Sequence, residues 1–155
     1  MGGSLGLRNC EKLRNYKEVI MDIFLYSETL GITSKALMIL RNVLANKIGH
    51  ELEVWQVAAL DGMAYGLIVM DYTKEQAVII GDGFRPDGGG EGGAGHRAAQ
   101  ALLAIYGIKL HESDEVVDYT EDVEDYTELV ASIPRIHPII PQSQHPQYID
   151  FIIRR

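Results

Sequence analysis

Residues 51–81 read ELEVWQVAALDGMAYGLIVMDYTKEQAVIIG, and this stretch decides the fold class. Near its middle, Asp61-Gly62 is a dipeptide that strongly favours a tight turn between two antiparallel strands. The runs on either side of this turn, and a further run after 72–75, are rich in β-branched and aromatic residues. The stretch therefore predicts a three-stranded antiparallel meander. The predicted strands are 51–60, 63–71 and 76–81.

The second half of this stretch is apolar on both faces of the predicted strands. Leu67–Met70 and Gln76–Gly81 contain few polar residues, which is typical of strands that are covered from both sides. Gly66 lies inside a strand pattern, where a glycine indicates a bulge or a close approach of another backbone. We therefore expect helices or loops on both faces of the sheet.

Two helical patterns precede the strands. Apolar residues at helical spacing predict an amphipathic helix over residues 9–30, and Gly31 follows it where a left-handed C-cap belongs. A second helix is predicted over 34–48, with Thr33 or Ser34 as its N-cap. The pair predicts a helical hairpin, either as a cover for the sheet or as a dimer contact.

The remainder of the chain is predicted to add helices and strands around this centre. The predicted elements are a helix over His96–Tyr106, a strand over Ile108–His111, an acidic helix over Thr120–Ile133 and a terminal strand over Tyr148–Ile153. The whole is predicted as a single α+β domain over 1–155, with a frayed start at 1–8 and a proline-rich extended segment at 134–147. An alternating βαβ pattern is missing, which argues against a doubly wound sheet.

Composition and charge exclude several classes of protein. The formal net charge is −8, and nine acidic residues with no Lys or Arg lie within His111–Ser132. Without a basic footprint, we expect no nucleic acid polymer as a partner. No apolar run approaches the ~20 residues that span a bilayer, and the first residues lack a secretory pattern, so no membrane partner is expected. A single cysteine, Cys10, suits the reducing cytoplasm.

The candidate site is Gly81–Arg97, GDGFRPDGGGEGGAGHR, because its glycine content is exceptional. Eight of the sixteen glycines of the chain lie in Gly81–Gly95. Each glycine raises the entropic cost of ordering a segment, so such density indicates a backbone that must bend sharply and approach something closely. The segment leads from an apolar strand into a helix, and free N–H groups at a helix N-terminus attract phosphate and other anions.

The side chains of this segment indicate a phosphorylated or nucleotide-like small molecule. Arg85 and Arg97 are expected to hold phosphate, and Phe84 to stack on a base. Three carboxylates suggest either a divalent cation or hydrogen bonds to ribose hydroxyls and base amino groups; the candidate metal ligands are Asp82, Asp87 and Glu91. The candidate ligand-binding residues are Gly81, Asp82, Gly83, Phe84, Arg85, Asp87, Gly88, Gly89, Gly90, Glu91, Gly92, Gly93, His96 and Arg97.

Two other classes of function stay open. A metal-dependent hydrolase or transferase would use Asp87, Glu91 and His96 for catalysis, although their spacing matches no P-loop, zinc or nucleophile motif. A protein–protein adaptor would use the acidic helix and the proline-rich segment, but leaves the glycines unexplained. We expect a binding protein that senses, carries or sequesters its ligand, and a homo-oligomer. The remaining histidines are interpreted as surface or turn residues: His50, His111, His137 and His145.

Overall fold

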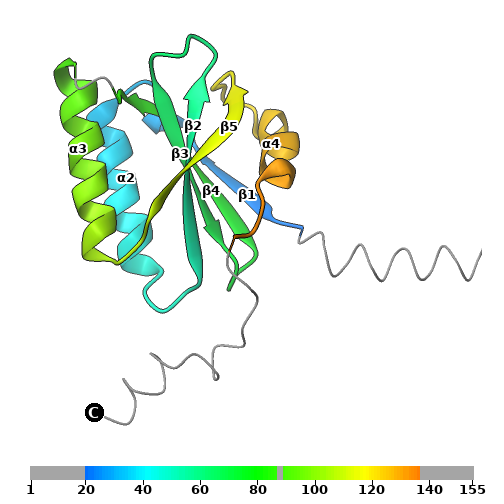
Figure 1. Cartoon of the computed structure of the whole chain (residues 1–155). Coiled ribbons are helices and arrows are strands. Elements are labelled where there is room, and N and C mark those ends of the chain that lie inside the picture. Colours follow the sequence, from blue (N-terminus) through cyan, green and yellow to red (C-terminus); the bar gives the residue numbers. More distant parts are fainter. Residues whose placement is uncertain (1–19, 87–88, 137–155) are drawn as a thin grey trace, which may run out of the picture.

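The computed structural model describes residues 20–86 and 89–136 of the 155-residue chain; residues 1–19, 87–88 and 137–155 lie outside the description. The described part is a mixed α+β fold built on a five-stranded sheet. Figure 1 shows two long helices side by side on one face of the sheet and a short helix on the other. Among the described helices, none is long and apolar enough to cross a membrane.

The sheet is mixed, with an antiparallel centre and two parallel edges. Its strands are β1 (Asp22–Tyr26), β2 (Leu52–Ala59), β3 (Tyr65–Asp71), β4 (Gln76–Phe84) and β5 (Leu110–Val117), in the spatial order β1-β4-β3-β2-β5. β2, β3 and β4 pair antiparallel, as the sequence predicts, but β1 pairs parallel with β4 and β5 pairs parallel with β2. The prediction of a simple meander is therefore not confirmed.

Helices cover both faces of the sheet and create two apolar cores. The described helices are the 3-10 helices η1 (Ser27–Thr29) and η2 (Val123–Tyr126), and the α-helices α2 (Thr33–Asn46), α3 (Gly90–Ile105) and α4 (Thr127–Ser132). One core packs α2 and α3 on the sheet around Leu40, Leu67 and Phe84. The other packs η2 and α4 on the opposite face around Trp55 and Ile79. This two-sided cover agrees with the apolar sequences of β3 and β4, which lie buried.

The β2–β3 hairpin forms as predicted around Asp61-Gly62. One carboxylate oxygen of Asp61 accepts N–H groups from Met63 and Ala64, at 2.9 and 3.3 Å, and Gly62 adopts a positive φ of 73°. These bonds hold the pKa of Asp61 below its ordinary value, since they stabilise the charged carboxylate. The connection spans 60–64 and is therefore longer than a two-residue turn.

The predicted N-terminal helix over 9–30 is wrong where the structure describes it. Residues 22–26 form strand β1 and 27–29 form η1, while 9–19 lie outside the described residues. The error has a physical reason: Ile23 and Phe24 fit helical spacing, but they also suit a strand that is apolar on both faces. Pairing with β4, more than fifty residues later in the chain, decides between the two. No helical hairpin is present in the described residues.

Other boundaries also shift. The second helix begins at Thr33 and ends at Asn46, and its N-cap residue is Ile32 instead of Thr33 or Ser34. The strand predicted over 108–111 extends to Val117. The acidic helix is shorter than predicted, since η2 and the six-residue α4 replace a continuous helix from Thr120. The predicted terminal strand at 148–153 lies outside the described residues.

One row of residues crosses the sheet where two strand registers shift. Val57 of β2 faces Gly66 of β3, β4 bulges beside Gly66, and β5 bulges beside Val57. The Tyr119 hydroxyl donates to the Val57 carbonyl at 2.6 Å and accepts from the Gly66 N–H at 2.9 Å. A Cβ at Gly66 would collide with the Tyr119 ring and the Ile80 carbonyl. The close approach that Gly66 predicts is thus confirmed, and Tyr119 ties β2 to β3.

Replacing Tyr119 with Phe should lower the free energy of unfolding by about 1–3 kcal/mol, because two buried backbone groups lose their partner. Urea unfolding monitored by circular dichroism measures this loss. Tyr106→Phe is the matched control, since the Tyr106 hydroxyl has no hydrogen bond within the described part of the chain. Equal stability of Tyr119→Phe and wild type would show that the bridge contributes nothing.

Candidate functional site

The first part of the glycine segment belongs to strand β4 and is bound within the chain. Between the paired residues Ile80 and Phe84, three residues bulge opposite Gly66. These three residues form three hydrogen bonds with the segment 29–33, which runs from the end of η1 to the start of α2. These are Gly81 N–H to Thr29 Oγ1 at 2.7 Å, Gly31 N–H to Asp82 Oδ1 at 2.9 Å, and Thr33 Oγ1–H to the Gly83 carbonyl at 2.5 Å.

Packing at this junction requires glycine at two of these positions. A Cβ at Gly81 would lie 2.7 Å from Cα of Leu30, and a Cβ at Gly83 would lie 2.9 Å from the backbone nitrogen of Thr33. Both distances are shorter than real Cβ contacts, and the obstacles are backbone atoms that cannot rotate away. The docking of α2 on β4 therefore accounts for Gly81, Asp82 and Gly83.

The second part of the segment is helical, which the sequence prediction did not foresee. α3 begins at Gly90, six residues before the predicted start at His96. Its glycines allow close packing: the side chain of Arg85 lies against Gly92, and Thr33 of α2 lies against Gly95. The backbone N–H of Arg85 also donates a hydrogen bond to the Gly92 carbonyl at 3.0 Å.

Arg85 and His96 meet the same face of α3. Gly92, on which Arg85 packs, is four residues before His96, and residues four apart are neighbours on a helix surface. The Tyr65 hydroxyl and His96 Nδ1 form a short hydrogen bond, and the Tyr65 ring stacks on Phe84 at a centroid distance of 5.3 Å. Burial, and then the charge of Glu112, raise the pKa of Tyr65, so its hydroxyl keeps its proton.

This hydrogen bond fixes the orientation of the His96 ring. Nδ1 is engaged by the Tyr65 hydroxyl, and the tautomer of the imidazole decides which of the two groups donates the proton. Tyr65 thereby holds the ring near the first turns of α3.

The other predicted site residues are spread around this point. Glu91 and Arg97 are exposed on α3, whereas Phe84 is fully buried against Tyr65, where it stacks on no ligand. Asp82 is bonded to the Gly31 N–H, away from Glu91. Asp87 and Gly88 lie outside the described residues. Within 20–86 and 89–136, no group of three or more His, Cys, Asp or Glu side chains is close enough together to hold a metal ion.

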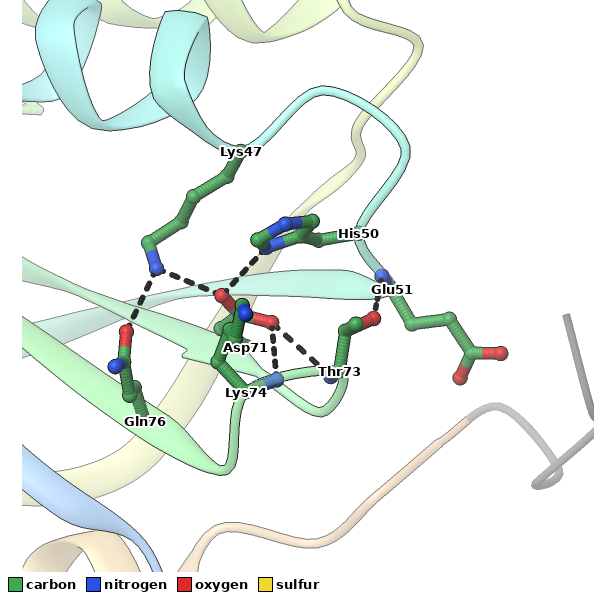
Figure 2. Close-up of polar contacts among 7 residues, drawn as sticks. All are labelled: Lys47, His50, Glu51, Asp71, Thr73, Lys74 and Gln76. Carbon is green, nitrogen blue, oxygen red and sulfur yellow. Dashed lines mark hydrogen bonds and ion pairs between the residues drawn. The ribbon is translucent and has the colours of Figure 1, made fainter.

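A buried charge network that sequence reasoning missed lies at the opposite end of the sheet (Figure 2). The Asp71 side chain is fully buried and accepts hydrogen bonds from Lys47 Nζ at 2.7 Å, and from the N–H groups of Thr73 and Lys74 at 3.0 and 3.1 Å. His50 Nδ1 lies 2.8 Å from the same carboxylate. Lys47 also donates to Gln76 Oε1 at 2.9 Å. The sequence offered one sign of this network, which is an aspartate at the end of an apolar strand.

The environment of Asp71 favours its ionised form. Burial alone raises the pKa of this carboxyl, but the hydrogen bonds from Lys47, His50 and the Lys74 N–H together outweigh burial and hold the pKa below its ordinary value. The network joins the end of α2 to the turn between β3 and β4. Its polar groups are satisfied by one another, so it serves the fold, and no partner from outside is needed.

Comparison of the chain with protein-family models, with curated proteins and with solved structures gives no match. The case for a functional site therefore rests on the geometry at the start of α3.

The two classes of glycine should respond differently to substitution. Gly81→Ala meets backbone at 2.7 Å and should lower the free energy of unfolding by about 1–3 kcal/mol. Gly92→Ala meets Cγ of Arg85 at 2.7 Å, so the Arg85 side chain must shift, but the variant gains up to about 1 kcal/mol of helix propensity and should lose less stability than Gly81→Ala. Thermal unfolding of the two variants tests the difference. Equal losses would mean that Arg85 is as immobile as the η1–α2 backbone.

Stability should depend on pH through Asp71. Because the folded-state pKa is depressed, the stabilisation is present above the unfolded-state pKa of about 4 and is lost as pH falls through the folded-state value. Asp71→Asn should cost about 3–5 kcal/mol at neutral pH and should flatten the acid dependence. Urea unfolding from about pH 7 to about pH 3 measures both, with the exposed Asp114→Asn as control. An unchanged acid profile in Asp71→Asn would assign acid sensitivity to other carboxylates.

Proposed function

We propose that the protein binds a small phosphorylated or nucleotide-like molecule, whose anionic group sits at the N-terminus of α3. The observation that carries this proposal is the start of a sixteen-residue helix at glycines, without a side-chain cap, beside an arginine. The first N–H groups of a helix point out of its end and carry partial positive charge. An anion at this position receives both hydrogen bonds and the favourable end of the helix dipole.

Arg85 supports an anionic ligand from the side of the helix. Its stem lies along Gly92, within the first turn of α3, which brings a positively charged side chain to this helix end. A guanidinium presents paired N–H donors that match the oxygens of phosphate. The glycine at 92 leaves room for this stem, which a larger side chain would displace.

His96 supports binding through Nε2, because its other ring nitrogen is engaged within the protein. Nδ1 is held by the Tyr65 hydroxyl, so Nε2 is the nitrogen that can form a hydrogen bond with a phosphate or hydroxyl oxygen of the ligand.

The first experiment is native mass spectrometry of gently purified protein, followed by denaturation to identify any released molecule. A phosphorylated small molecule that leaves on denaturation is the expected result. Calorimetric titration with pyrophosphate then provides a defined probe of the anion site, for both occupied and emptied protein. Absence of both a co-purified molecule and pyrophosphate binding would contradict the proposal.

Arg85→Ala should weaken pyrophosphate binding by about 1.5–3 kcal/mol, the usual strength of a hydrogen bond to a charged group. Arg41→Ala is the matched control, because Arg41 is an exposed arginine of α2. A melting temperature close to that of wild type must accompany the loss, so that misfolding is excluded. Equal affinity of the Arg85 and Arg41 variants would remove Arg85 from the site.

A further inference from the structure

The two edges of the described sheet differ in a way that bears on assembly. β5 is a protected edge: it carries exposed acidic residues at 112, 114 and 115, and its register with β2 is interrupted by a bulge. Charges and bulges of this kind prevent a further strand from pairing. β1, the other edge, carries a single charged residue, Asp22 at its start, and its register with β4 runs without a shift.

β1 also exposes apolar surface on the side of α2. Phe24 lies at the centre of the strand with 45% of its surface exposed. Beside it, a groove of about 260 Å³ lies between β1, β4 and α2. Its lining is apolar at Phe24, Tyr26, Ile39, Val43 and Val78, and polar at Asn42, Asn46, Lys47 and Gln76. Pockets for small molecules usually enclose about 300–1,000 Å³. The groove is therefore a better match for a side chain than for a metabolite.

From this edge we infer that the protein forms a dimer in which the β1 strands of two copies pair antiparallel, joining both sheets into one. The strand is complementary to itself about a two-fold axis through Phe24. In that register Phe24 lies opposite the same residue of the second copy, and Ile23 lies opposite Leu25. Asp22 lies opposite Tyr26, so no like charges face each other.

Two of these cross-strand pairs, Phe24 with its copy and Ile23 with Leu25, are of a favourable kind. Aromatic pairs and pairs of aliphatic side chains on one sheet face stabilise antiparallel strands, whereas like charges directly opposite destabilise them. Ile23 and Leu25 are only partly buried against the α4 side of the sheet, so a second copy would complete their burial. Phe24 and the adjacent groove would be covered on the α2 side in the same step.

This dimer goes beyond the proposed ligand site and does not depend on it. The paired edge is β1, whereas the anion site lies at the start of α3, and neither Arg85 nor His96 lines the groove beside Phe24. Either inference can fail without the other, because mass in solution reports on the dimer and pyrophosphate titration reports on the anion site.

The test compares two edge substitutions in the full chain. Phe24→Lys places a charge on β1, and Val116→Lys places the same charge on β5, where the replaced valine is 56% exposed. Sedimentation velocity over a dilution series should give a dimer for wild type and Val116→Lys, and loss of the dimer for Phe24→Lys. Unchanged melting temperatures at high dilution would show that both variants fold.

Hydrogen exchange gives a second measurement that does not require a mutation. Amides of β1 should become more protected as wild-type protein is concentrated, and amides of β5 should not. A monomeric wild type at all concentrations, or a dimer that survives Phe24→Lys, overturns the inference. A monomer whose β1 amides lose protection when residues 148–155 are deleted would also overturn it, and would assign the edge to the C-terminal segment of the same chain.

Discussion

The fold depends on the close contact of three elements at Thr33, the first residue of α2. Its hydroxyl donates to the Gly83 carbonyl of β4, and its methyl group lies where a side chain at Gly95 of α3 would have to be. Thr29 and Gly31 add hydrogen bonds from the same connection to Gly81 and Asp82. A Cβ at Gly81, Gly83 or Gly95 would force α2 and the residues before it away from the sheet or from α3, so the junction sets the spacing of all three elements.

This junction also determines which side chains lie at the start of α3. The helix must begin close to the end of β4, and residues 85–89 are the entire connection between them. Arg85 therefore cannot be far from the first turn of α3, and Gly92 allows its stem to pack there. His96 follows one turn later, oriented by Tyr65. The arrangement at the candidate site is thus a consequence of packing, and the separate network at Asp71 stabilises the other end of α2.

Local patterns predicted the centre of the fold and the start of β5, but not β1 or the extent of α3. The hairpin at Asp61 and the buried strands followed from turn chemistry and from residues apolar on both faces. β1 was predicted as a helix, since only its pairing with β4 distinguishes a strand from a helix here.

Gly90–Gly95 was predicted as a loop because each glycine costs about 1 kcal/mol in a helix relative to alanine. The contact of Thr33 with Gly95 joins residues that are sixty-two positions apart, which local patterns do not detect. Of the predicted site, Arg85 and His96 meet on one face of α3, while Asp82 and Phe84 serve the fold.

The glycine content of the segment has two separate causes, and only one of them bears on a ligand. Gly81, Gly83 and Gly95 are explained by backbone or side chains that would clash with a Cβ. Gly90 is different: nothing lies within 4 Å of a Cβ there, and its φ is +56°. Packing does not require it, but a chain that turns sharply into a helix end does, because side chains disfavour a positive φ. Gly90 therefore sets a sharp turn into α3, whose N-cap residue, Gly89, makes no side-chain cap bond. The proposed anion site depends on this turn and on Arg85, and not on the number of glycines.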